Sequence, residues 1–410
     1  MSISPQTAQP VQSGPLKAEA VLLGQVSFVH LISHIHFMTL PALLPILPAR
    51  LGVSFIDLGA AITLYNFVSF LVQTPMGFAT DRFGARRVLT AGLIIGSVSL
   101  LVVAIVPTYG CLLVAMAALG LANGVYHPCD YALLSNGIDG SRMGRAFSIH
   151  TFAGYLGTAI TPPLLLGTAA FAGLSSAFAV AGLIGLAGAL MLILVNPDPA
   201  RPDTAADAGE RASEPARPVS RLALVTPTVL SLMAMFVLLA LSTSGISSFS
   251  VSALVMGYGT DLSTANAALT GFLFASAIGV LAGGALADRT AHHGLVAAGA
   301  YGLTAIISLT LALTQPPALG LLVMLGAAGF LTGIITPSRD MMVRAAAPKG
   351  SEGIVFGIVS TGFNIGGLIG PLLYAWLLDS GQTSAIFAVA ALFMVLTVTL
   401  AIVQDLRART

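Results

Sequence analysis

Charged side chains are scarce in this chain. Only 8% of its 410 residues are Asp, Glu, Lys or Arg, whereas a soluble domain carries about 25%. Hydrophobic residues make up 56%, and the mean hydropathy is +0.94. Most of the chain must therefore face membrane lipid or other helices. The net charge of +1, with no basic stripe, excludes a nucleic-acid-binding protein.

Cysteines are equally few. Cys111 and Cys129 are the two cysteines, and both fall in one predicted helix, roughly 27 Å apart at about 1.5 Å per residue. That separation excludes a disulfide between them. Because the sequence shows no phosphate loop, nucleotide motif or nucleophile–base pair, we expect no enzyme activity, no cofactor and no metal site. Any active transport must then use an ion gradient or the solute's own gradient.

Twelve apolar runs reach the length of about 20 residues that a membrane-spanning helix needs. The sequence therefore predicts an all-α membrane protein with twelve transmembrane helices. The predicted helices are 23–46, 56–79, 88–106, 110–134, 146–168, 172–195, 223–247, 262–287, 295–314, 319–338, 353–376 and 383–403.

These helices form two halves of six, residues 23–195 and 223–403. Residues 196–222 between them are rich in Pro, Ala, Asp, Glu and Arg, which predicts a solvated linker. We interpret residues 1–22 and 404–410 as polar tails, and we expect no removable signal peptide.

The positions of the basic residues predict the orientation in the membrane. If both termini lie in the cytoplasm, Arg50 is the one residue of the 17 Lys and Arg that lies outside. Basic residues favour the cytoplasmic side. We therefore expect a bacterial-type inner-membrane protein whose termini and linker face the cytoplasm.

A short basic turn follows the second predicted helix, and it resembles the loop 2–3 signature of the major facilitator superfamily. Its defining residues are Gly77, Asp81, Arg82, Gly84, Arg86 and Arg87, and a weaker copy with Asp288 and Arg289 lies 207 residues later. The resemblance implies the major facilitator fold of two six-helix repeats. It also implies a monomeric secondary transporter that moves a small molecule by alternating access.

The two halves also align with each other, as expected for a parallel repeat. The matched pairs, all offset by 209 residues, are Gly124–Pro128 with Gly333–Pro337, Gly144–Phe147 with Gly353–Phe356, and Gly157–Pro162 with Gly366–Pro371. By the family resemblance, we expect Asp81 to meet the start of the eleventh helix near Gly353 when the transporter opens outward. Asp288 should face the region of Gly144 more weakly.

Ionisable residues inside the spans are functional candidates because burying charge in hydrocarbon is costly. The first helix carries His30, His34 and His36. His30 and His34 share a face, whereas His36 points about 200° away from His34. We expect His34 to contact the substrate or the coupling proton; the alternative is a histidine hydrogen-bonded to a neighbouring carbonyl group.

The fourth helix carries Asn123, Tyr126, His127 and Asp130. Asn123, His127 and Asp130 share one face, where a carboxylate and an imidazole could hold a proton. We therefore expect His34, His127 and Asp130 to carry any proton linkage. The alternative that Asp130, near the helix end, simply meets cytoplasmic water stays open.

Other polar residues are candidates for the cavity, although each could equally serve helix packing. They are Tyr65, Asn66, His150, Tyr155, Arg339 and Asn364.

Ser33-His34 and Val125–Pro128 resemble the fosmidomycin-resistance branch of the superfamily, a group of drug exporters. The chain departs from that branch at Met38 and Cys129, where acidic residues are typical. The resemblance implies proton-coupled efflux of a small organic molecule. Two alternatives stay open: uptake of a small organic solute or anion, and a transporter-like membrane receptor that moves nothing.

Overall fold

The structure is a computed structural model that describes residues 13–140, 142–195, 225–287, 289–290, 292–348 and 351–407. Twelve of its helices are long and apolar enough to cross a membrane, which confirms the all-α membrane fold. The first half contains α1 (Ser13–Leu43), the short α2 (Leu47–Leu51), α3 (Phe55–Phe83), α4 (Ala85–Ile105), α5 (Tyr109–Gly137), α6 (Met143–Ala172) and α7 (Leu174–Leu194).

The second half repeats this plan. It contains α8 (Pro227–Ser244), a π-helical turn (Gly245–Phe249) and α9 (Ser250–Tyr258) as one continuous span, then α10 (Leu262–Ala287), α11 (His293–Leu313), α12 (Ala318–Ala346), α13 (Glu352–Asp379) and α14 (Ala385–Arg407).

Several helices are longer than the sequence predicts. The first helix begins at Ser13 and not at residue 23, so residues 13–22 of the predicted polar tail form the start of α1. Likewise α5 runs to Gly137 and α12 to Ala346. Hydropathy marks the apolar part of a helix, whereas backbone hydrogen bonding continues into its polar ends. The predicted linker 196–222 and Asp288 lie outside the described residues.

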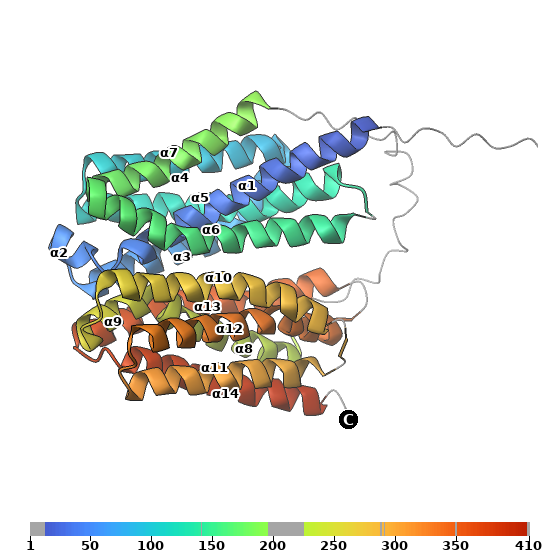
Figure 1. The fold of residues 1–410 in the computed structure, drawn as a ribbon. Coiled ribbons are helices and arrows are strands. Elements are labelled where there is room, and N and C mark those ends of the chain that lie inside the picture. Colours follow the sequence, from blue (N-terminus) through green and yellow to red (C-terminus); the bar gives the residue numbers. More distant parts are fainter. Residues whose placement is uncertain are drawn as a thin grey trace, which may run out of the picture.

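The two halves lie side by side, and the axes of their helices are roughly aligned (Figure 1). The start of α1 and the end of α14 lie at one end of the bundle, on the right in Figure 1, which we call the terminal end. Helix α2 lies at the opposite end, which we call the α2 end.

The helix bounds reproduce the repeat predicted from the sequence. Helices α5 and α12 begin 209 residues apart, at positions 109 and 318, and end 209 apart, at 137 and 346. Equivalent glycines allow equivalent close helix contacts in both halves. A Cβ atom on Gly120 would collide with the Tyr65 carbonyl of α3, and one on Gly329 would collide with the Phe272 carbonyl of α10.

The halves are joined at the α2 end through α3 and α13. Thr63 donates a hydrogen bond to the Leu368 carbonyl at 3.1 Å, and Asn66 donates to the Gly367 carbonyl at 2.9 Å. Nearer the terminal end, a cavity of about 350 Å³ lies between α6 and α10, with Pro337 of α12 in its wall. The structure is therefore closed at the α2 end and hollowed toward the terminal end.

The close glycine contacts make a stability prediction. Replacing Gly329 by Ala should destabilise the protein by about 1–3 kcal/mol, because the new methyl group must push α10 away. At Gly326 in the same helix, an added Cβ atom would meet nothing within 4 Å, so Gly326→Ala should be neutral or slightly stabilising. Thermal unfolding in detergent measures both variants. Equal midpoints would show that this contact does not govern the packing.

Candidate functional site

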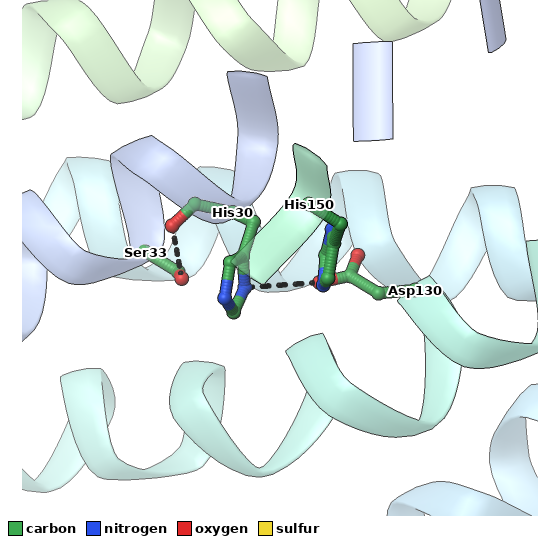
Figure 2. A network of polar contacts seen from close by, with 4 residues as sticks. All are labelled: His30, Ser33, Asp130 and His150. Carbon is green, nitrogen blue, oxygen red and sulfur yellow. Dashed lines mark hydrogen bonds and ion pairs between the residues drawn. The ribbon is translucent and has the colours of Figure 1, made fainter. Parts of the chain in front are cut away.

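The core of the candidate site is a buried carboxylate in α5. The Asp130 side chain is 0% exposed, and Oδ2 lies 3.4 Å from Nδ1 of His30 in α1 and 3.6 Å from Nε2 of His150 in α6. Figure 2 shows the two imidazole rings beside the carboxylate group. Within the described part of the chain, neither Asp130 oxygen has a hydrogen-bond partner. Asp130 is thus enclosed by protein, which answers the question that its position near the helix end left open.

Three further histidines surround His30. The His30 and His150 rings stack at 3.9 Å, and the His30 ring lies 4.7 Å from His34 and 5.6 Å from His127. His34 and His127 are half-buried. The Nδ1 atom of His34 lies 2.8 Å from the Thr158 hydroxyl. His34 therefore pairs with a side chain and not with the backbone carbonyl that the sequence allowed.

Two glycines of α6 create the space for these rings. A Cβ atom on Gly154 would lie 2.6 Å from Nε2 of His30 and 2.8 Å from Nε2 of His34, and one on Gly157 would collide with the Leu31 carbonyl. Small residues let membrane helices approach closely. The cluster exists because α1 and α6 cross at these two positions.

His36 lies on the other side of α1, as helical geometry predicts. Its Nε2 atom is 3.2 Å from the Ala181 carbonyl of α7. A Cβ atom on Gly96 or Gly185 would contact its ring. His36 is buried in a packing position between α4 and α7, away from Asp130.

Two of the remaining polar candidates of the first half, Asn123 and Asn66, make their contacts away from Asp130. Asn123 donates a hydrogen bond to the Ser69 hydroxyl of α3 at 2.7 Å, so it serves the α3–α5 contact. Tyr65 and Tyr126 are buried, and Asn66 bridges the two halves. Sharing a helical face with Asp130 was therefore not enough to bring Asn123 into the cluster.

The second half presents a cation where the first presents an acid. Arg339 of α12 is 18% exposed, and its Nε donates to Asp340 Oδ1 at 3.0 Å. Its guanidinium carbon lies 5.0 Å from the ring centre of Phe236 and 4.9 Å from that of Phe363, which is a cation–π contact on both. Asn364, next to Phe363, is half-buried.

Arg339 and Asp130 occupy equivalent positions, because they are separated by the 209 residues that relate α5 to α12. In one half the acid lies beside a stacked pair of imidazole rings, and in the other the cation lies against a pair of neighbouring phenyl rings. Tyr155 of α6 lines the cavity.

The residues of the loop signature lie at the terminal end, where some are exposed and Arg86 forms hydrogen bonds. Asp81, Arg82 and Arg87 are exposed. Arg86, in contrast, donates to the carbonyls of Leu192, at 2.7 Å, and Val195, and so caps the carboxyl end of α7. In addition, Gly84 adopts a φ of +87°, which favours glycine, and a Cβ atom on Gly77 would meet open space. Arg289 is exposed.

A polar contact that the sequence analysis missed holds the halves together at the α2 end. Asp379, the last residue of α13, accepts hydrogen bonds from the backbone N–H groups of Phe55 at 3.0 Å and Ile56 at 2.7 Å. A carboxylate is unfavourable at the carboxyl end of its own helix but favourable at the amino end of another. This geometry makes Asp379 a latch between α13 and α3.

Comparisons with known proteins agree with this architecture. The chain matches the model of the Major Facilitator Superfamily over residues 26–267 and 232–409. It is 26% identical to the fosmidomycin resistance protein of Escherichia coli (strain K12) over 297 residues, 70% of this chain and 71% of that protein. It is 28% identical to a probable nitrate/nitrite transporter, NarK2, of Mycobacterium tuberculosis (strain CDC 1551 / Oshkosh), covering 74% and 78% of the two chains.

A shorter match, 27% identity over 43% of this chain and 41% of the relative, is to the probable sulfoacetate transporter SauU of Cupriavidus necator. Among solved structures, the fold is similar to a bacterial homolog of the human lysosomal transporter Spinster, crystallised in an inward-facing and occupied conformation. The TM-score is 0.73 at 14% identity, covering 94% and 95% of the two chains. Two matched six-helix halves and a family model that spans nearly all of them lead to one conclusion: the chain belongs to the major facilitator superfamily.

Proposed function

We propose that this major facilitator transporter exports a small organic molecule in exchange for protons, by alternating access. The observation that carries the proposal is the asymmetry between the two ends of the bundle. Hydrogen bonds join the halves at the α2 end, and a cavity lies between them toward the terminal end. If both termini are cytoplasmic, this is the inward-facing state in which an exporter takes up its cargo.

The cavity suits a small amphipathic molecule. Its volume of about 350 Å³ lies at the lower end of the range for small-molecule sites. Aromatic and aliphatic side chains form most of the wall, with three hydroxyl groups among them: Phe147, Ser148, Thr151, Phe152, Tyr155, Val280 and Leu281. The similarity to a fosmidomycin resistance protein favours export. The absence of a nucleotide motif from the sequence favours an ion gradient as the energy source.

A second candidate is uptake of a small organic anion. Arg339 favours it, because a guanidinium group that lies against two aromatic rings keeps a fork of N–H donors that suits a carboxylate or a sulfonate. The similarities to a probable sulfoacetate transporter and a probable nitrate/nitrite transporter point the same way. Both candidates use the same fold and differ in the direction of transport.

The test of export is drug susceptibility in a bacterial strain that lacks its own exporters. Expression of the wild-type chain should lower susceptibility to some compounds of a chemically diverse panel, and a protonophore should abolish the effect. Tyr155→Ala removes a wall of the cavity and should abolish the effect too. Phe171→Ala, in the same helix at a residue that is 95% exposed, should behave like the wild type.

The opposite results separate the alternatives. Increased susceptibility to anionic compounds would favour uptake. Export is excluded if expression changes susceptibility to no compound of the panel and if everted vesicles with an imposed pH gradient accumulate none of these compounds.

The latch at the α2 end makes a second prediction. Asp379→Asn removes the charge that faces the start of α3, and should weaken closure by about 1 kcal/mol, roughly fivefold in population. Spin labels at the exposed positions Pro107 and Gln382, in a background without Cys111 and Cys129, would report the distance between the halves at this end. In the variant, a larger fraction of molecules should show the longer distance between the two labels.

Asp261→Asn is the matched control. Asp261 caps α10 within its own half by accepting from the Thr264 N–H at 2.8 Å, so its loss should leave the distance distribution unchanged. An unchanged distribution in Asp379→Asn as well would show that the latch does not hold the α2 end closed.

A further inference from the structure

Three buried side chains from three different helices converge on one point. His30 of α1, Asp130 of α5 and His150 of α6 each offer one ligand atom, and these atoms lie within 4.8 Å of one another. All three side chains are buried. The set of two imidazoles and one carboxylate is a recurrent arrangement for transition metals in proteins.

The distances within this cluster fit metal ligands better than they fit hydrogen bonds. A charge-assisted N–H···O bond is about 2.7–2.9 Å long, whereas Asp130 Oδ2 lies 3.4 Å from His30 Nδ1 and 3.6 Å from His150 Nε2. Two ligand atoms bound to one tetrahedral ion at about 2.0–2.2 Å are about 3.3–3.6 Å apart. Both separations from Asp130 Oδ2 fall in that interval, and the ligand atoms of the two imidazoles lie within 4.8 Å of each other.

The same atoms lack other partners. Within the described residues, Nδ1 of His30, both ring nitrogens of His150 and both carboxylate oxygens of Asp130 are buried without a hydrogen bond. Burying polar groups unpaired is costly, and more so for a charged group. A cation at their centre would satisfy three of these atoms at once.

We propose that His30, Asp130 and His150 bind a divalent transition metal ion of the Zn²⁺, Co²⁺ or Ni²⁺ type. Imidazole nitrogen selects these ions over Mg²⁺ and Ca²⁺, which take oxygen ligands, and the absence of a thiolate disfavours Cu⁺. Three protein ligands leave a fourth position for water or for a donor group of a bound solute.

This site was not visible in the sequence, where we expected no metal. Metal-binding motifs are recognised by short spacings within one segment, whereas these ligands stand at positions 30, 130 and 150 and meet only when α1 packs on α6. The inference concerns binding to the folded chain and does not rest on the direction or the coupling of transport.

The test is metal binding to the purified full-length protein. The chain is isolated in detergent through a tag without histidines, stripped with a chelator, and titrated with Zn²⁺ by calorimetry. Co²⁺ serves as a second probe, because a four-coordinate cobalt ion absorbs visible light more strongly than a six-coordinate one. One Zn²⁺ per chain and a four-coordinate Co²⁺ spectrum are expected.

The variants locate the ion. Because loss of a residue that only supports a ligand costs about 10–100-fold in affinity, His150→Ala and Asp130→Asn should each weaken Zn²⁺ binding by at least about 100-fold. His36→Ala is the matched control: it also removes a buried histidine of α1, but one bonded to Ala181, and should bind like the wild type. All variants retain His292 and His293, so a surface site would persist in every one.

Two results would overturn the proposal. One is that the wild type binds no Zn²⁺, or binds it no more tightly than His150→Ala. The other is that His36→Ala loses binding to the same degree. His150→Gln, which keeps a polar side chain of similar size, and a thermal-unfolding midpoint for each variant separate loss of the ligand from loss of the fold. If the wild type exports drugs but binds no Zn²⁺, the metal-site proposal is refuted while the proposed export stands.

Discussion

A carboxylate enclosed within a membrane-spanning helix bundle is the constraint around which the first half of this protein is built. Placing an acidic side chain inside a membrane-spanning segment is costly. Asp130 has no hydrogen-bond partner among the described residues, and its nearest polar neighbours are two imidazole rings. The glycines at 154 and 157 keep those rings in place by letting α1 approach α6. We propose that an arrangement this costly serves binding and not stability.

The repeat gives this constraint a counterpart in the second half. Arg339 stands where the internal symmetry places Asp130, and it contacts the paired rings of Phe236 and Phe363 as Asp130 lies beside the paired rings of His30 and His150. The two halves thus share a backbone plan but present opposite charges from α5 and α12. A rocking motion that closes the terminal end would change the surroundings of both charges together, which is how a pair of repeats can couple the binding of two species.

Local patterns in the sequence were enough to predict the fold. Apolar runs of spanning length predicted twelve helices, and the 209-residue offset predicted the repeat that α5 and α12 reproduce. The helical turn of about 100° per residue separated His36 from His34. The surroundings of Asp130 could not be predicted, because His150 reaches it only through the crossing of α1 and α6. Asp379 was missed for a similar reason: its partner is the start of α3, 324 residues away.

The central claim is that Asp130 is retained for binding and transport at the expense of stability, and paired substitutions test it most directly. We would measure the thermal-unfolding midpoint and transport for Asp130→Asn and Asp130→Leu beside the wild type. Since replacing a buried charge by an apolar group of similar volume is often neutral or stabilising, the account predicts unchanged or raised midpoints with transport lost in both variants. Lowered midpoints with transport intact would contradict it, and would make Asp130 a structural residue.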